Sequence, residues 1–302
     1  MAILKNSTEE QQRRAIERLT VDDALKLDAD FETWAHKNQL PPGGEGWRTW
    51  LMLAGRGFGK TRAGAEWIFR LATGKPKVRI ALVGATIADA RSIMVEGVSG
   101  LLTIARRYRR RLHWEPSLSR LSWPNGSEAQ LFSGDSADGL RGPENDFAWC
   151  DELAKWREVE EAWVNLQFGL RRGQRPRALV TTTPRPIDLL TRIMADPWTV
   201  TTRGRTSDNI NLDEKTIEVL TATYGGTRIG AQELDGELIH DVEGALWTRE
   251  VIERSFDTPF RQGSMATQDE RNAAFDRIVV GVDPPAGASE GSDACGIVVC
   301  GS

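Results

Sequence analysis

Apolar residues are distributed along the chain in two kinds of pattern. Four short, nearly continuous apolar runs are typical of strands buried on both faces, and they cover residues 49–54, 79–85, 147–150 and 177–183. Longer stretches with helical spacing lie between them, at 60–72, from 86 to about 107 and at 155–170. Because helices that alternate with buried strands form crossover connections, this order predicts an α/β fold with a mostly parallel central sheet flanked by helices.

Other segments fall outside this pattern. Residues 1–46 are expected to form a helical N-terminal segment, in which Ser7 and Glu10 have capping-box spacing before a helix that ends near Leu19. A Pro-Asn-Gly sequence at 124–126 separates two short apolar runs and predicts a hairpin. Residues 241–276 are polar and rich in turn residues, as in a linker, and two more strands are expected at 277–283 and 294–300. We therefore expect a main domain over 47–240 and the start of a second over 277–302.

Composition narrows the class of protein. No apolar run reaches the roughly 20 residues of a membrane span, and the N-terminus turns polar by Lys5, so neither membrane insertion nor secretion is expected. Three cysteines and three histidines without metal-ligand spacing disfavour a disulfide scaffold and a zinc site. The net charge of −4 argues against a uniformly basic surface, so any contact with nucleic acid has to come from local patches.

The segment 54–61, AGRGFGKT, lies between a predicted strand and a predicted helix. Its glycines allow backbone N–H groups to converge on phosphate oxygens at a helix N-terminus. In the pattern G-x-x-x-x-G-K-[ST], Lys60 reaches the β- and γ-phosphates and the Thr61 hydroxyl binds Mg²⁺. Ala54 replaces the first glycine of the pattern, and Gly55 can supply the turn. The alternative is a glycine-rich turn with an incidental lysine. The residues of the predicted ATP site are Gly55, Arg56, Gly57, Phe58, Gly59, Lys60 and Thr61.

Two acids follow the apolar run 147–150 directly. At the carboxyl edge of a sheet, Asp151 can hold Mg²⁺, and Glu152 can orient and deprotonate the water that attacks the γ-phosphate. Acid pairs are also common at helix starts, where they stabilise the helix dipole. The position after a buried strand, about 90 residues beyond the glycine-rich loop, favours the catalytic interpretation.

Further candidates contribute hydroxyl groups or positive charge. Thr181, Thr182 and Thr183 end the run 177–183 and can sense the γ-phosphate or the water, or they are ordinary β-branched strand residues. Arg56 lies inside the glycine-rich loop and can lie over the γ-phosphate. Arg141, ten residues before Asp151, is either a surface charge or an arginine that reaches a neighbouring subunit's nucleotide. Such arginines are worth roughly 10³–10⁵ in kcat in phosphoryl transfer.

Several motifs in order resemble the large terminase subunit of tailed bacteriophages and gene transfer agents. They are WLMLAGRGFGKTRAGAEW, DGLRGPENDFAWCDELAKW, ALVTTTPRP and GVDPP. The resemblance implies a P-loop ATPase that drives double-stranded DNA into a procapsid, followed by an RNase H-like nuclease that uses Mg²⁺ or Mn²⁺. It also implies a subunit that acts in the host cytoplasm, forms a ring with copies of itself, and works with the portal protein and the small terminase subunit.

The resemblance implies roles for individual residues. Residues 55–61 become Walker A, with Arg56 as its internal arginine. Asp151 and Glu152 become Walker B and the catalytic glutamate, and Thr181–Thr183 become the motif that couples hydrolysis to DNA movement. Arg141 matches a position proposed to act between subunits, and Gln39 is a weak match to an adenine-contacting glutamine.

The nuclease half is only begun in this sequence. Asp283, at the end of the run 277–283, matches the first metal-binding carboxylate of the nuclease, and Asp293 is a nearby acid without an assigned role. The later carboxylates would lie beyond Ser302. We therefore expect the first strands of an incomplete RNase H-like domain, and no DNA cleavage by residues 1–302 alone.

Two clusters of arginines could contact DNA phosphates without reading sequence, or could form solvated surfaces. They are Arg106, Arg107, Arg109, Arg110 and Arg111, and Arg171, Arg172, Arg175 and Arg177. Two other functions remain open at this level. One is a helicase-like or recombination ATPase, which would unwind strands, and the other is a nucleotide-binding scaffold without turnover.

Overall fold

The computed structural model describes residues 8–239, 278–283 and 296–301. By contacts between residues, the chain divides into two units, Met1–His240 and Asp241–Ser302. No helix within the described ranges has the length and apolar character that crossing a membrane requires.

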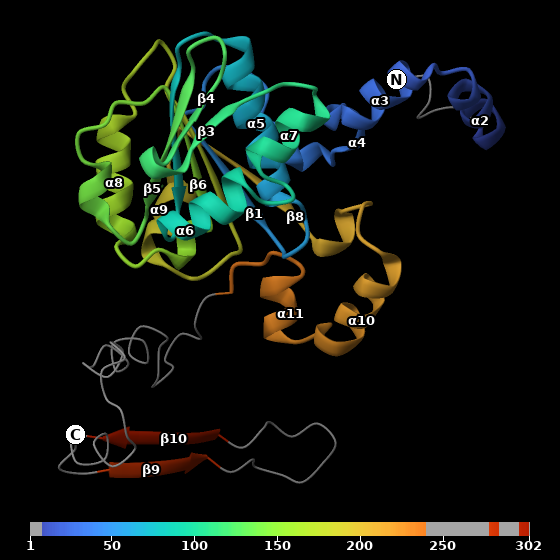
Figure 1. Cartoon of the computed structure of the whole chain (residues 1–302). Coiled ribbons are helices and arrows are strands. Elements are labelled where there is room, and N and C mark those ends of the chain that lie inside the picture. The colour runs from blue at the N-terminus through green and yellow to red at the C-terminus, as the bar shows by residue number, and fades with distance from the viewer. Residues whose placement is uncertain (1–7, 240–277, 284–295, 302) are drawn as a thin grey trace. The chain divides into compact units, whose positions relative to one another are not determined.

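An eight-stranded sheet forms the centre of the first unit, in the order β3-β4-β5-β2-β6-β7-β1-β8 (Figure 1). All neighbouring pairs from β5 to β8 are parallel, and the pairs β3–β4 and β4–β5 are antiparallel. The sheet is therefore mostly parallel, as predicted. Its strands are β1 Thr49–Ala54, β2 Arg79–Gly84, β3 His113–Glu115, β4 Arg120–Ser122, β5 Glu128–Ser133, β6 Phe147–Asp151, β7 Arg177–Thr182 and β8 Thr199–Gly204.

Helices cover both faces of this sheet. The α-helices are α2 Glu9–Glu17, α3 Val21–Ala29, α4 Phe31–Trp34, α5 Lys60–Gly74, α6 Ile87–Asp89, α7 Leu101–Arg107, α8 Val159–Gly169, α9 Asp188–Ala195, α10 Glu214–Tyr224 and α11 Arg228–Glu233. Short 3₁₀ turns are η1 Lys37–Gln39, η3 Pro116–Leu118, η4 Ala137–Leu140, η5 Leu153–Lys155 and η6 Thr206–Asp208, and η2 Ala90–Val95 is a π-helical turn.

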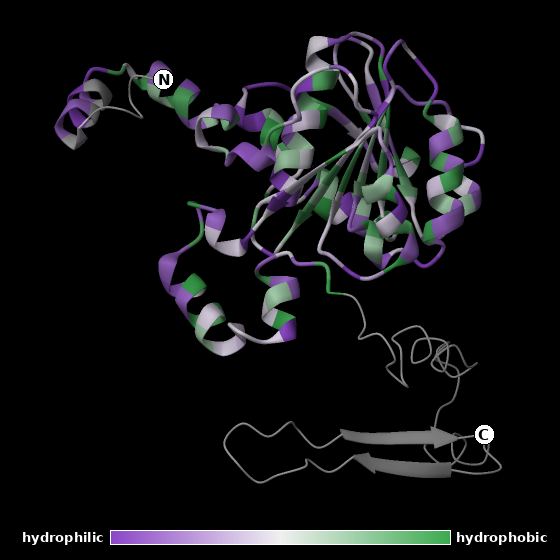
Figure 2. Cartoon of the chain, turned by 180° about the vertical axis from the view of Figure 1, so that it is seen from behind, coloured by the Kyte–Doolittle hydropathy of each residue, from purple (hydrophilic) through white to green (hydrophobic). Residues whose placement is uncertain are grey.

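Alternating residues of the central strands divide the core into two layers. In β1, Trp50 and Met52 point to the face covered by α5 and α7, whereas Leu51 and Leu53 point to the face covered by α8 and α9. The apolar colouring is concentrated in the strands and in the helix faces that meet them (Figure 2). Strands buried on both faces explain why these runs lack a polar alternation in the sequence.

At the start of the first described helix, the backbone N–H groups of Thr8 and Gln11 each donate to the other residue's side chain. Ser7 of the predicted capping box lies outside the described residues. Two predicted boundaries further along the chain are wrong. The helix expected from 86 to 107 is divided into α6, η2 and α7. The break between η2 and α7 contains Gly97 and Gly100, where a Cβ would meet backbone carbonyl oxygens at 2.6 Å and 2.7 Å. The helix expected from Lys155 begins only at Val159, after the 3₁₀ turn η5.

The sheet also contains an edge strand that the apolar pattern does not predict. Strand β8, with the sequence TVTTRG, is mostly polar and half-exposed, so it lacks the signal of a buried strand. It pairs in parallel with β1 over its whole length. Edge strands need little burial, because one side of their backbone faces away from the sheet.

In the second unit, β9 Ile278–Asp283 and β10 Gly296–Gly301 form an antiparallel pair, with Gly296 opposite Asp283. Both strands agree with the predicted runs to within two residues. The predicted linker 241–276 and Asp293 lie outside the described residues. The described residues contain no cluster of three or more potential metal-ligating side chains, so the predicted nuclease metal site at Asp283 stays a prediction.

Candidate active site

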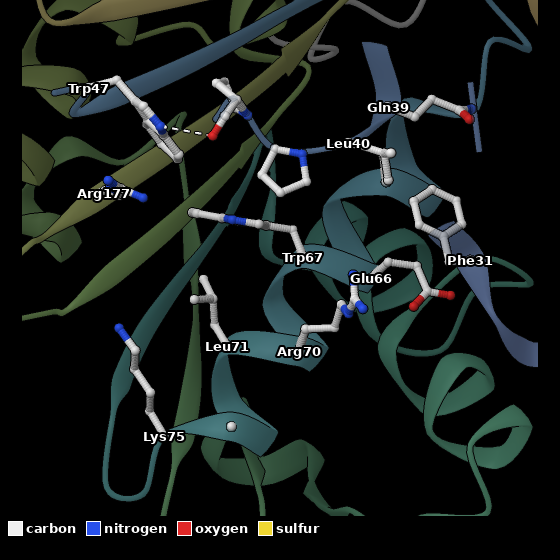
Figure 3. A pocket seen from close by; sticks show the side chains of 14 residues that line it. Phe31, Gln39, Leu40, Trp47, Glu66, Trp67, Arg70, Leu71, Lys75 and Arg177 are labelled. Carbon is white, nitrogen blue, oxygen red and sulfur yellow. Dashed lines mark hydrogen bonds between the residues drawn. The ribbon is translucent and has the colours of Figure 1, made fainter. Parts of the chain in front are cut away.

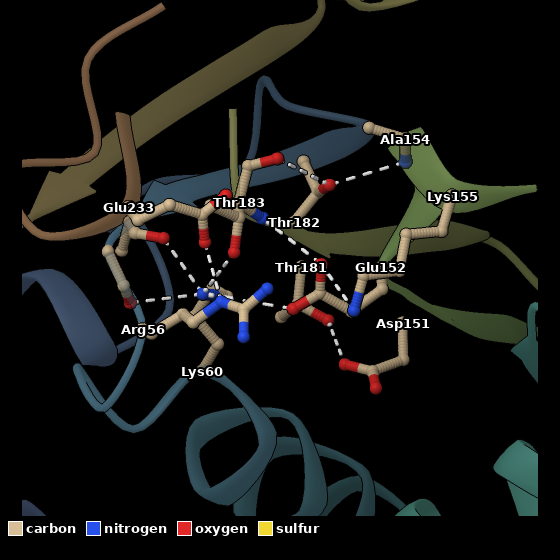
Figure 4. A network of polar contacts seen from close by, with 12 residues as sticks. Arg56, Lys60, Asp151, Glu152, Ala154, Lys155, Thr181, Thr182, Thr183 and Glu233 are labelled. Carbon is tan, nitrogen blue, oxygen red and sulfur yellow. Dashed lines mark hydrogen bonds and ion pairs between the residues drawn. The ribbon is translucent and has the colours of Figure 1, made fainter. Parts of the chain in front are cut away.

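The candidate phosphate site lies at the carboxyl ends of three adjacent strands. Strand β7 lies between β1, which leads into the glycine-rich loop, and β6, which ends in Asp151. The three strands are parallel, so their carboxyl ends share one edge of the sheet. This arrangement brings Lys60 together with the acids 151–152 and the threonines 181–183, although the sequence separates these residues by up to about 120 positions (Figure 4).

Two glycines give the loop its shape. Gly57 and Gly59 have φ angles of 77° and 96°, in the left-handed region that favours glycine. A Cβ on Gly59 would also lie 2.5 Å from Nε2 of Gln39. Helix α5 then begins at Lys60, so its N-terminus points into the loop, as an anion site requires.

Lys60 is buried in this loop, with its side chain 7% exposed. Its Nζ donates to the carbonyl oxygens of Ala54 at 2.8 Å and Gly55 at 3.1 Å, and to Oγ1 of Thr183 at 3.1 Å. Its ammonium also lies 3.9 Å from Oε1 of Glu152. Burial lowers the pKa of Lys60, because the charged form is desolvated. The ammonium is therefore held by neutral oxygens and one carboxylate at the point where a P-loop binds phosphate.

Asp151 is also buried, and its charge has little compensation. Its Oδ1 accepts a hydrogen bond from Oγ1 of Thr181 at 2.7 Å. Burial raises its pKa to about 6, and the Thr181 hydrogen bond and the charge of Lys60 offset only part of this effect. A buried carboxylate supplies hard oxygen atoms, which are the ligands that Mg²⁺ prefers. The chemistry of Asp151 therefore fits a Mg²⁺ ligand.

Glu152 has a backbone conformation that is uncommon for a non-glycine residue. Its φ is 49°, in the left-handed region, and its backbone N–H donates to the carbonyl oxygen of Thr181 at 2.6 Å. Its Oε2 accepts from the backbone N–H of Thr183 at 3.3 Å and lies 3.7 Å from Nζ of Lys155. Left-handed residues of this kind cost about 1–3 kcal/mol and occur often at functional sites. The turn aims the carboxylate across β7 toward Lys60.

All three threonines of the predicted coupling motif are buried, and each has a different partner. Thr181 bonds to Asp151, and Thr183 accepts from Lys60. The hydroxyl of Thr182 accepts from the backbone N–H of Ala154 at 3.2 Å, which ties β7 to the turn after Glu152. The strand end of β7 therefore contacts both the loop and the acid pair. This contact is the geometry that the coupling prediction requires, but the coupling itself stays a prediction.

Arg56 extends outward from the loop, with its side chain 68% exposed. Its Nε lies 2.5 Å from Oε2 of Glu233 in α11, and its backbone N–H donates to the carbonyl oxygen of Glu233 at 2.6 Å. The γ-phosphate role predicted for Arg56 would require the side chain to leave this ion pair.

Sequence reasoning missed the residues that hold the loop from the far end of the unit. Oγ1 of Thr206 donates to the carbonyl oxygen of Arg56 at 2.6 Å, and Nδ2 of Asn209 donates to that of Gly57 at 2.6 Å. The carbonyl of Leu234 approaches Gly55 so closely that a Cβ there would lie 2.2 Å from its oxygen. These residues lie about 150 positions or more after the loop, and no local pattern in the sequence links them to it.

Gln39 also contacts the loop. Its Nε2 donates to the carbonyl oxygen of Phe58 at 2.6 Å, and its Oε1 accepts from the backbone N–H of His36 at 2.8 Å. The side chain is buried, and both ends of the amide have protein partners. This geometry supports a role in positioning the loop, and the contact with adenine stays a prediction.

Arg141 does not lie with these residues. It follows η4 in the segment that leads to the start of β6, and the neighbouring Pro143 carbonyl packs against Gly169 at the end of α8. Asn145 donates its backbone N–H to Gly169 at 2.9 Å. Helix α8 follows the carboxyl end of β6 and precedes β7, so its end lies at the opposite edge of the sheet from Asp151. The side chain of Arg141 is exposed.

Several arginines of the two basic clusters are paired with acids of the same chain. Arg107 and Arg109 bond to Asp28 and Asp22 of α3 at 2.9 Å and 3.0 Å. In the second cluster, Arg171, Arg172 and Arg175 pair with Glu144, Asp146 and Glu45. Arg177 stacks on the ring of Trp47 at 3.9 Å. These contacts favour the structural interpretation for the paired members.

A separate cavity of about 390 Å³ lies along α5 (Figure 3). One face of α5 forms one wall, and the segment between Phe31 and Trp47 forms another. Glu66, on this face, is completely buried, and burial raises its pKa in spite of the two hydrogen bonds that Arg62 donates to its Oε1. Of the predicted ATP-site residues, only Gln39 lines the cavity, so the phosphate site lies elsewhere.

Comparison with known proteins decides the family. The family model "Terminase large subunit, T4likevirus-type, N-terminal" matches residues 51–254, which is more than half of the chain. The chain belongs to the large terminase subunit family. No match was found among curated proteins.

Solved terminases share the fold. The ATPase domain of the Thermus phage P74-26 large terminase has a TM-score of 0.54 and 18% identity, over 70% of this chain and 98% of that one. The large terminase of a thermophilic bacteriophage in complex with ADP has a TM-score of 0.56 and 14% identity, over 72% of this chain and 53% of that one. The HK97 bacteriophage large terminase has a TM-score of 0.51 and 16% identity, over 93% of this chain and 63% of that one. The chain thus spans about half of the ADP-bound terminase.

These findings confirm the predicted family and the α/β fold. They also confirm, at the level of the family, the prediction of a terminase motor subunit, because the matching family model is that of the terminase large subunit. A nuclease domain after residue 277 and the roles of individual site residues are not tested by these comparisons.

Proposed function

We propose that this large terminase chain hydrolyses ATP with Mg²⁺ at the shared edge of β1, β7 and β6, and that the hydrolysis moves double-stranded DNA. The observation that carries the proposal is the meeting of Lys60 and Glu152 at 3.9 Å across β7, with Asp151 fixed beside them by Thr181. A P-loop lysine after β1 meets a metal carboxylate and a candidate base at the end of β6, and the threonines of β7 lie between them.

Each residue of the site would have a separate role in ATP binding and hydrolysis. Backbone N–H groups of 55–61 would bind the phosphates, and Lys60 would exchange its carbonyl partners for β- and γ-phosphate oxygens. Thr61 and Asp151 would hold Mg²⁺, which neutralises charge on the phosphates when bound. Glu152 would orient the attacking water and accept its proton, and its fixed turn would keep the carboxylate in place. Arg56 would move from Glu233 to the γ-phosphate.

Two substitutions test this assignment. Lys60→Ala should abolish ATP binding and turnover, because the loop loses its only buried cation. Glu152→Gln should lower kcat by at least about a hundredfold and leave ATP binding intact, because the amide retains its size but cannot accept a proton. Phosphate release and equilibrium binding of a fluorescent ATP analogue would measure both effects. Normal hydrolysis by both variants would refute the assignment, and binding without turnover by the unmodified chain would indicate a scaffold.

The coupling of hydrolysis to DNA would use the end of β7. Thr181 contacts the metal carboxylate, Thr182 the turn after Glu152, and Thr183 the P-loop lysine, so a change at the phosphates reaches all three contacts. We propose that the complete subunit acts as a ring of copies on a procapsid portal in the host cytoplasm, together with a small terminase subunit. DNA-stimulated ATP turnover supports the motor, whereas strand unwinding by the purified chain would favour a helicase-like enzyme.

A further inference from the structure

Trp149 lies in the middle of β6, two residues before Asp151, and is completely buried. Its indole Nε1 donates to Oγ1 of Thr181 on the adjacent strand at 2.9 Å. The same Thr181 oxygen lies 2.7 Å from Oδ1 of Asp151. One tryptophan, one threonine and one aspartate thus form a continuous buried chain of hydrogen bonds that ends at the metal carboxylate.

The donors and acceptors in this series of hydrogen bonds have only one favourable arrangement. An indole N–H can only donate, so Thr181 must accept from Trp149 and has its single proton left to give. Two acceptors are within reach, Oδ1 of Asp151 at 2.7 Å and the carbonyl oxygen of Cys150 at 3.3 Å. The shorter bond, to a carboxylate, is the stronger one. Trp149 therefore helps to fix the direction in which the Thr181 hydroxyl points.

The indole itself cannot easily rotate away. Gly64, on the helix that begins at Lys60, lies so close that a Cβ would come within 2.2 Å of the Trp149 ring. The ring is thus packed directly against α5, and its N–H is directed along the sheet to β7. Packing against α5 therefore fixes the indole of Trp149, whose N–H orients the Thr181 hydroxyl. The Thr181 hydroxyl in turn orients the carboxylate of Asp151.

We infer that Trp149 is a positioning residue for Mg²⁺ binding, which acts through Thr181 to hold the carboxylate of Asp151 in one orientation. This inference rests on the proposed function, because it takes Asp151 as the metal ligand. Residues that hydrogen-bond to metal ligands typically contribute ten- to a hundredfold to metal affinity. The loss of the Trp149 N–H leaves the Thr181 hydroxyl free to turn to Cys150, and the carboxylate then loses its fixed partner.

The test uses the full chain with Glu152→Gln, which is expected to bind ATP without hydrolysing it. Binding of N-methylanthraniloyl-ATP is titrated at increasing Mg²⁺ concentrations, so that the readout does not depend on turnover. Trp149→Phe should raise the half-saturating Mg²⁺ concentration about tenfold. Thr181→Val should raise the half-saturating Mg²⁺ concentration by a similar factor. The two changes together should have little further effect, because both interrupt the same series of hydrogen bonds. Thr181→Ser, which retains the hydroxyl, should restore the original Mg²⁺ dependence.

A matched control lies in the same sheet. Trp50, on β1, is also completely buried, and its Nε1 donates to Oγ1 of Thr202 on the adjacent strand at 2.8 Å. Trp50→Phe removes the same kind of bond without a link to Asp151, so it should leave the Mg²⁺ dependence unchanged. An equal shift with Trp50→Phe and Trp149→Phe, or no shift with Trp149→Phe and Thr181→Val, would overturn the inference.

Two further variants separate this inference from the proposed function. If Lys60→Ala abolishes nucleotide binding and Asp151→Asn raises the Mg²⁺ requirement, the site assignment stands, and a lack of effect of Trp149→Phe counts against the inference alone. If Asp151→Asn leaves the Mg²⁺ requirement unchanged, the assigned metal site fails first. Unfolding midpoints of all variants in the absence of Mg²⁺ show whether any shift reflects a loss of folding.

Discussion

At the level of single residues, several side chains of the candidate site lower the free energy of unfolding of the protein without nucleotide. Asp151 and Lys60 are both buried, and burial moves each pKa in the direction that disfavours the charged form. Glu152 adds a left-handed backbone conformation next to them. A fold selected only for stability would not gather such groups at one strand edge. Their cost is understandable if phosphate and a cation compensate the charges when ATP is bound.

Asp151→Asn should therefore stabilise the protein in the absence of ligand. The pKa of Asp151 is raised from 3.8 to about 6, so the folded state holds the proton more tightly than the unfolded chain. This contribution to stability is fully present below about pH 3.8 and is lost as the pH rises through about 6. At pH 8 the substitution should raise the free energy of unfolding by up to about 3 kcal/mol, and at pH 5 by about half of that.

Urea denaturation at both pH values, without Mg²⁺ or nucleotide, would measure this difference. Asp138→Asn is a suitable control, because Asp138 is exposed and should show little effect. A gain that does not depend on pH, or a loss of stability at pH 8, would contradict the burial argument.

At the scale of elements, the loop is held by segments from both ends of the unit. Gln39 from η1 and Asn209 after η6 donate to its carbonyls. Glu233 at the end of α11 and Leu234 directly after it also contact the loop. Helix α11 is thus the element whose position is most directly tied to the side chain of Arg56. The ion pair between Arg56 and Glu233 is partly exposed, so its contribution is modest.

Glu233→Gln should tighten ATP binding slightly, because Arg56 no longer has to leave an ion pair to reach the γ-phosphate. A partly exposed pair is worth about 0.2–1 kcal/mol, which corresponds to a decrease of up to about fivefold in the dissociation constant for ATP. Titration with a fluorescent ATP analogue would measure the change. Glu237→Gln removes an exposed carboxylate from the same segment and should have no effect. Weaker binding by Glu233→Gln would show that the pair supports the bound state instead.

At the scale of the whole molecule, Arg141 and the acid pair are carried by different parts of the fold. The segment after Arg141 packs on the end of α8, whereas Asp151 lies at the carboxyl end of β6. We therefore expect Arg141 to act, if it takes part in ATP hydrolysis, on the site of a neighbouring copy of the chain.

Arg141→Ala should lower kcat by at least about tenfold where subunits assemble, and should leave the turnover of dilute monomer within about twofold. Steady-state ATPase rates over a range of protein concentrations, with light scattering to follow assembly, would separate the two cases. Arg18→Ala, at another exposed arginine, serves as the charge control. An unchanged rate in the assembled ring would remove Arg141 from the site, and an equal loss in the monomer would place it in its own site.

The sequence predicts those strands and site residues that leave a signal within a few neighbouring positions of the chain. Buried parallel strands are continuous apolar runs, so β1, β2, β6 and β7 were predicted to within about one residue at each boundary. The Gly-Lys-Thr loop and the two acids were predicted because their chemistry depends on short fixed spacing after a strand. The interruption at Gly97 and Gly100 and the polar strand β8 were missed, because packing and edge pairing determine them.

Spacing along the chain and side-chain chemistry are local properties, so the sequence alone shows that a glycine-rich loop follows one strand and an acid pair follows another. The folded structure is needed to show that β7 lies between these two strands, that Lys60 faces Glu152 and Thr183, and that Trp149 reaches Thr181. Strand order and hydrogen-bond partners cannot be found locally, because they depend on how distant segments bury their apolar faces together.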